Sequence, residues 1–62
     1  MDMDFSEMDH EELFYRVEVL LKQKGFHSVS ETWEETARRI KDQDPEMAEL
    51  LFKAQQRWDE LH

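Results

Sequence analysis

Residues 21–26 read LKQKGF and residues 42–46 read DQDPE, and these two stretches decide the fold. Gly25, the only glycine, ends an apolar run with helical spacing, and glycine suits the left-handed residue that follows a helix. Pro45, the only proline, opens another such run, and proline suits the first residue inside a helix. The two residues therefore divide the chain into three pieces, each with the apolar period of a short helix.

Caps and periodicity predict one all-α, three-helix domain, with helices over about residues 9–24, 31–42 and 45–61. The expected N-caps of the first and third helices are Asp9 and Asp44, and that of the second is Ser28 or Ser30. Residues 1–6 alternate acids with apolar residues without a helical period, and we interpret them as a flexible acidic tail. A helix hairpin that dimerises into a bundle is the alternative architecture.

Steps of 100° along each helix sort the apolar residues into faces. The residues assigned to the core are Leu13, Phe14, Val17, Leu20 and Leu21; Trp33, Ala37 and Ile40; and Met47, Leu50, Leu51, Ala54, Trp58 and Leu61. Tyr15 and Val19 form a second apolar stripe on the opposite side of the first helix, and Phe52 lies outside the stripe of the third. Because two short helices can cover only one face of the first, we expect self-association through Tyr15 and Val19.

Charge patterning on the second helix predicts a solvated outer face. Its acids and bases are spaced four residues apart, which favours the ion pairs Glu34–Arg38 and Glu35–Arg39.

The 62 residues carry 16 acids against eight Lys and Arg, a net charge of −8 with no cysteine. Residues 1–12 alone carry −6. This charge repels nucleic-acid phosphates and anionic membranes but favours a basic protein surface. We therefore expect no direct binding to nucleic acid or membrane. The lack of cysteine fits a cytoplasmic protein, and no apolar run approaches the ~20 residues of a membrane span.

Catalytic and metal-binding patterns are not evident. The serines stand at cap positions, and His27 and His62 have no pattern of metal ligands around them. His10 has only Glu7 at helical spacing, and a lone Glu–His pair is a weak metal signal. We also expect so small a bundle to have little room for a ligand pocket of ~300–1,000 Å³. The sequence therefore predicts a non-enzyme without metal or cofactor.

The function that the sequence favours is a small acidic regulator or adaptor of inhibitor type that binds another protein, one with a basic or apolar groove. The candidate partner-binding residues are Met3, Phe5, Glu7, Glu11, Glu12, Tyr15, Val19 and Phe52. One alternative is an acidic nucleic-acid mimic that blocks the basic cleft of a DNA- or RNA-processing enzyme. The other is a structural homodimer subunit of a larger assembly.

Overall fold

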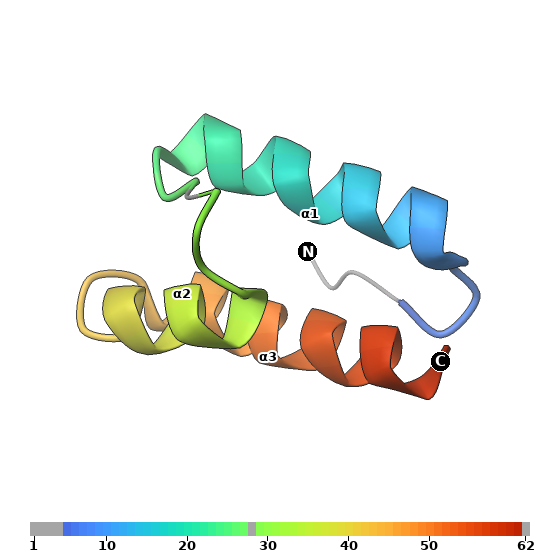
Figure 1. Cartoon of the computed structure of the whole chain (residues 1–62). Coiled ribbons are helices and arrows are strands. Elements are labelled where there is room, and N and C mark those ends of the chain that lie inside the picture. Colours follow the sequence, from blue (N-terminus) through green and yellow to red (C-terminus); the bar gives the residue numbers. More distant parts are fainter. Residues whose placement is uncertain (1–4, 28, 62) are drawn as a thin grey trace.

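The computed structural model describes residues 5–27 and 29–61, which form three α-helices and, within those ranges, no strand. The helices are α1 (His10–Lys24), α2 (Trp33–Ile40) and α3 (Pro45–Glu60), so the all-α prediction is confirmed and its boundaries are right to within two residues. α2 and α3 lie side by side in one layer, and α1 lies over that layer (Figure 1). None of the helices in the described ranges is both long enough and apolar enough to cross a membrane.

The predicted N-caps of α1 and α3 are confirmed. Asp9 Oδ1 accepts a hydrogen bond from the Glu12 N–H at 2.9 Å, and Asp44 Oδ1 accepts one from the Met47 N–H at 3.1 Å. Each carboxylate satisfies an N–H that has no partner inside the helix and lies at the positive end of the helix dipole. These caps fix where both helices begin.

The end of α1 is also the one predicted. Gly25 has φ 76°, in the left-handed region, and its N–H donates to the Lys22 carbonyl at 3.2 Å. The Phe26 N–H donates to the Leu21 carbonyl at 2.9 Å, which completes a Schellman ending and turns the chain away from α1.

The start of α2 differs from the prediction. Its N-cap is Thr32 rather than Ser28 or Ser30; Ser30 lies two residues before the cap, and Ser28 lies outside the described residues. Thr32 Oγ1 accepts from the Glu35 N–H at 3.2 Å and donates to the Glu35 carboxylate at 3.3 Å. The residue three positions after Thr32 is a glutamate, so the threonine hydroxyl bonds both the N–H and the carboxylate of Glu35, and α2 begins two residues later than Ser30 would have placed it.

The outer face of α2 carries one of the two predicted ion pairs. Arg38 and Glu34 are 2.8 Å apart, as predicted, but Arg39 pairs with Glu31 at 2.9 Å instead of with Glu35. Arg39 also donates to the Phe26 carbonyl at 2.9 Å. Arg39 therefore ties the connection between α1 and α2 to α2 itself.

The buried apolar side chains come from all three helices and from the segment before α1. They are Phe5, Leu13, Val17, Leu21, Trp33, Ala37, Ile40, Met47, Ala48, Leu51 and Ala54. Trp33 is buried as expected, whereas Trp58 packs against the core with part of its surface exposed. Phe14, which periodicity assigned to the core, is 51% exposed. Its ring does face Trp33 and Trp58, so helical periodicity predicts the direction of this side chain correctly but its degree of burial wrongly.

The segment before α1 corrects the interpretation of residues 1–6 as a tail, as far as it is described. Phe5 is only 6% exposed and belongs to the core. A turn follows, in which the Met8 N–H donates to the Phe5 carbonyl at 3.1 Å, and the guanidinium of Arg57 donates to the Met8 carbonyl at 3.0 and 3.2 Å. Residues 1–4 lie outside the described part.

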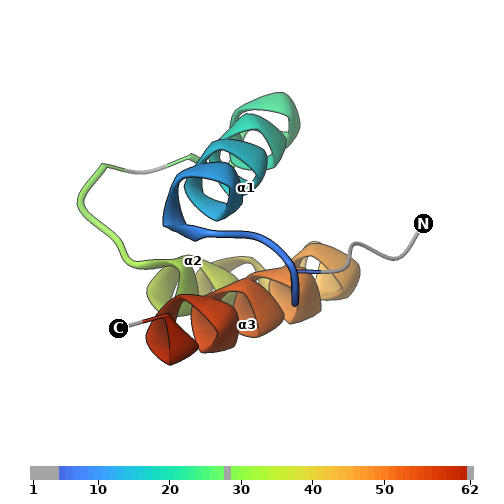
Figure 2. The same ribbon diagram turned by 90° about the vertical axis from the view of Figure 1, so that its right-hand side faces the viewer.

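The position of α1 leaves the domain asymmetric. α1 contacts α3, but within residues 5–27 and 29–61 no Cα of α1 lies within 8 Å of a Cα of α2. Residues 5–9 pass between α1 and α3 on the side away from α2 (Figure 2). Residues 5–9 therefore cover one side of the interface between α1 and α3, the side away from α2.

The C-terminal end of α1 is joined to the start of α3 by an ion pair. Lys24 Nζ and Asp44 Oδ2 are 3.1 Å apart. The N–H of Met47 and the ammonium of Lys24, both hydrogen-bonded to its carboxylate, lower the pKa of Asp44 from its ordinary value. A lowered pKa stabilises the folded state above the ordinary Asp value of about 3.9, and this contribution is lost as the pH falls through the lowered pKa.

The unfolding free energy should fall when the pH is lowered below about 4, because Asp44 is then protonated. We expect this fall to be smaller in the Asp44→Asn variant. Asparagine can still cap α3, but it carries no charge for Lys24. Urea midpoints at pH 7 and pH 3 measure the effect, with Asp42→Asn as the matched control because Asp42 is exposed in the same connection. Equal pH dependence in the two variants would contradict this role of Asp44.

Candidate functional site

An open groove of about 780 Å³ runs between α1 and α2, on the side of α1 that residues 5–9 leave uncovered. One wall is α1, from Glu11 to Lys22; the other is the connection that starts at His27 and ends at Trp33; Gln55 and Trp58 of α3 form the floor. The expectation of little room for an enclosed ligand pocket did not foresee this open groove. Helical periodicity predicts faces but not the distance at which two helices stand, and here α1 stands away from α2.

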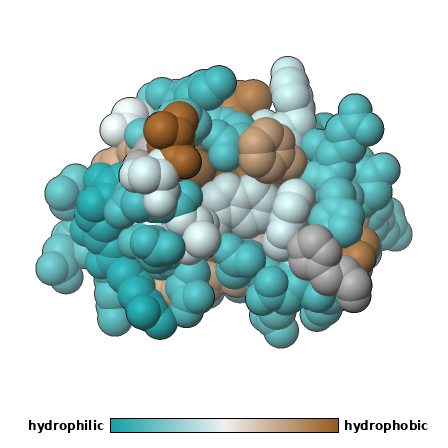
Figure 3. All heavy atoms as spheres, viewed as in Figure 1, coloured by the Kyte–Doolittle hydropathy of each residue, from teal (hydrophilic) through white to brown (hydrophobic). Residues whose placement is uncertain are grey.

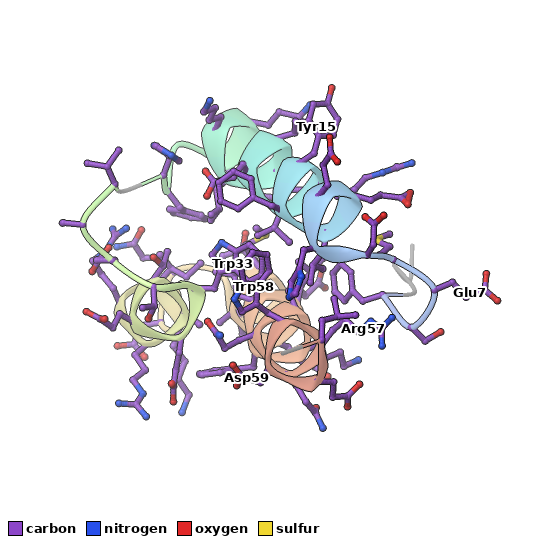
Figure 4. The ribbon with its side chains drawn as sticks, turned by 45° about the vertical axis from the view of Figure 1, so that its right-hand side comes forward. Glu7, Tyr15, Trp33, Arg57, Trp58 and Asp59 are labelled. Carbon is purple, nitrogen blue, oxygen red and sulfur yellow. The ribbon has the colours of Figure 1, made fainter. Side chains whose placement is uncertain are left out.

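Aromatic rings form the inner part of the groove. Trp33 and Trp58 meet edge to face, with ring centroids 5.4 Å apart and an interplanar angle of 74°. The ring centroid of Phe14 lies 6.4 Å from that of Trp33 and 6.3 Å from that of Trp58. The His10 ring also contacts Trp58, with centroids 4.5 Å apart. Figure 4 shows both tryptophans between α1 and the layer below it. Ring pairs at such distances stabilise one another, so the groove has an aromatic inner surface.

The outer part of the groove is apolar and exposed. Phe14 is 51% exposed, Tyr15 66% and Val29 93%. A site for a small ligand encloses most of the ligand surface, whereas these lining side chains stand open to solvent. In Figure 3, apolar and near-neutral side chains gather near the middle of one face, with hydrophilic side chains around them.

The rim of the groove is mainly acidic. Its charged residues are Glu11, Glu18 and Glu31 against Lys22, with His27 as a titratable neighbour. His27 Nε2 lies 2.9 Å from Glu18 Oε2, a contact that holds the connection against α1. The rim therefore presents an excess of carboxylates around an aromatic floor.

Three of the candidate residues chosen from the sequence come together here. Glu11, Tyr15 and Val19 all line the groove. Glu12 is exposed outside it and pairs with Arg16 at 3.9 Å.

The other candidates lie elsewhere. Glu7 is exposed and projects away from the helices (Figure 4), and Phe52 is 39% exposed on α3 outside the groove. Phe5 is buried in the core, and Met3 lies outside the described residues. The structure therefore brings one acidic candidate, Glu11, together with two apolar ones, Tyr15 and Val19, and leaves Glu7, Glu12 and Phe52 outside that surface.

Sequence reasoning missed Phe14, Trp33, Trp58 and Val29 as groove residues. The first three were assigned to the core, and Val29 was placed in a connection without a role. The signal that pointed to the groove was the excess of apolar circumference on the first helix, of which Phe14 is a part.

Several of the polar side chains that line the groove are engaged in structural contacts. Over the described ranges, no three His, Cys, Asp or Glu side chains come close enough together to hold a metal ion. The Thr32 hydroxyl is engaged in capping α2, and Glu18 is paired with His27. Aromatic surface and rim charge are what the site offers.

Comparisons with protein-family models, curated proteins and solved structures find no match to this chain, so its function is argued from the groove.

Proposed function

We propose that this protein is a non-enzymatic regulator or adaptor of the cytoplasm that binds another protein through the groove between α1 and α2. The observation that carries the proposal is that three exposed apolar side chains, Phe14, Tyr15 and Val29, line the same groove as Trp33 and Trp58. Single exposed apolar residues are ordinary, but a continuous apolar surface rimmed by polar residues marks a site of interaction. A regulator of inhibitor type would act by holding its partner in this groove.

A second copy of the chain is the other candidate occupant, because Tyr15 and Val19, on which the expectation of self-association rested, both line the groove. Sedimentation at micromolar concentration separates the two candidates. A homodimer through the groove should revert to a monomer on Tyr15→Glu, whereas an adaptor for another protein should be monomeric from the start.

A nucleic-acid mimic receives less support from the structure. A mimic needs rows of carboxylates whose charge is not cancelled nearby. Here Glu34 is paired with Arg38 at 2.8 Å, and Glu49 lies 3.5 Å from Lys53. Alternating charges of this kind give a solvated helix face and not a phosphate-like track.

Site-specific photo-crosslinking in cells that make the protein tests the proposed function. A benzoylphenylalanine at position 29 places the reactive group in the groove, and the same group at position 52 is the matched control, since Phe52 is exposed outside it. We expect a discrete adduct with another protein from position 29 and none from position 52. An adduct from position 52 alone would place the binding surface elsewhere, and no adduct from either position would contradict the proposed function.

A further inference from the structure

We infer that the occupant of the groove is the apolar face of a short basic amphipathic helix supplied by the partner protein. This inference rests on the proposed function and adds the chemical class of the partner segment.

The arrangement of the helices favours a helix as the occupant. α1 and α2 both pack on α3 but not on each other. The groove lies between α1 and the connection that leads into Trp33 of α2, with Gln55 and Trp58 of α3 as its floor, so its long wall is a helix. The α1 wall extends from Glu11 to Lys22, which at 1.5 Å per residue is roughly 16 Å, or three helical turns. A helix of about that length would lie along α1 with its side chains over α3.

The lining favours a helix with one apolar face. Phe14, Trp33 and Trp58 give the groove a broad hydrophobic inner surface. A bound strand adds to the open edge of a sheet, and residues 5–27 and 29–61 contain no strand. Helices that bind in grooves insert apolar side chains at positions i, i+3, i+4 and i+7 into hydrophobic surfaces of this kind. Tyr15 and Val29 stand at the two edges, where they can cover the flanks of that face.

Charge complementarity favours lysine and arginine on the flanks of the helix. The groove is lined by Glu11, Glu18 and Glu31 against Lys22, but Arg39 pairs with Glu31 at 2.9 Å. The attraction of a basic segment therefore rests mainly on the net charge of the chain, which is −8. A basic helix is attracted by this field, whereas a second copy of this chain brings another −8 towards the same rim. The charge therefore separates the inferred partner from a homodimer.

Three synthetic twelve-residue peptides without tryptophan test the inference against the whole chain. The first has leucine at i, i+3, i+4 and i+7 and lysine elsewhere; the second has glutamate in place of lysine; the third is the first with its order scrambled so that the stripe is lost. Tryptophan emission reports binding, because Trp33 and Trp58 are the only two tryptophans and both line the groove. We expect the first peptide to bind at least about tenfold more tightly than either of the others.

Matched variants locate the binding. Tyr15→Ser should weaken the first peptide by about three- to tenfold, because an exposed interface ring is lost without disturbing the core, while Phe52→Ser should leave its affinity unchanged. Glu11→Gln should weaken it about two- to threefold at low salt and flatten its salt dependence, while Glu46→Gln, also in the first turn of a helix but outside the groove, should do neither.

Equal binding of the first and second peptides would overturn the basic partner, and equal binding of the first and scrambled peptides would overturn the amphipathic helix. Weakening by Phe52→Ser as large as that by Tyr15→Ser would overturn the groove as its site. If no peptide binds while position 29 still gives its adduct, this inference is wrong and the proposed function stands. If the adduct is missing as well, both are wrong.

Discussion

Replacing Trp33 by alanine is expected to leave most of the protein molecules unfolded at room temperature. Trp33 is 8% exposed and is the first residue of α2. Its ring centroid lies 5.4 Å from that of Trp58 and 6.4 Å from that of Phe14. Truncation of a buried tryptophan costs about 3–5 kcal/mol, and a core of this size supplies only about 3–5 kcal/mol of net stability. Circular dichroism during urea titration should therefore show little or no folded baseline for the variant.

Two further variants show whether the loss comes from burial. Trp33→Phe keeps an aromatic ring and should restore a cooperative transition. Trp58→Ala should cost less than Trp33→Ala, because Trp58 keeps part of its surface in solvent. A Trp33→Ala protein with a urea midpoint near that of the parent would contradict the core described above.

Replacing Phe5 by alanine is expected to lower the unfolding free energy by about 3 kcal/mol, the lower end of the range for buried phenylalanine, because residues 5–9 lie outside the helices and can readjust. Phe5 is 6% exposed, and the turn that follows it is held by the bond from Arg57 to the Met8 carbonyl. Glu7→Ala is the control, since Glu7 is exposed in the same turn, and should change stability by less than about 0.5 kcal/mol. Identical urea midpoints for the two variants would show that Phe5 belongs to a tail after all.

The features predicted correctly from the sequence depend on residues close together in the chain. Gly25 ends α1, Pro45 begins α3, and Asp9 and Asp44 cap their helices, because each of these roles involves bonds within a few residues. The predicted cap of α2 was wrong for a local reason as well. Three Ser or Thr residues precede this helix, and Thr32 is the one whose third following residue is a glutamate inside α2, Glu35.

The features that were missed depend on distances between distant segments. Periodicity gives the direction of Phe14 towards the tryptophans, but nothing local indicates that α1 stands away from α2 and leaves that ring half exposed. Phe5 belongs to no periodic run, and its burial follows from where residues 5–9 pass between α1 and α3. The groove arises from both of these facts together, and its residues were therefore divided between core and surface.

The most direct test of the central claim, that this groove is the binding surface, is an amide and indole NMR titration of the whole chain with the basic amphipathic peptide. The predicted result is a shift of the Trp33 and Trp58 indole signals together with amides of residues 11–22 and 29–33, while amides around Phe52 stay in place. Shifts centred on Phe52, with both indole signals unmoved, would contradict the account.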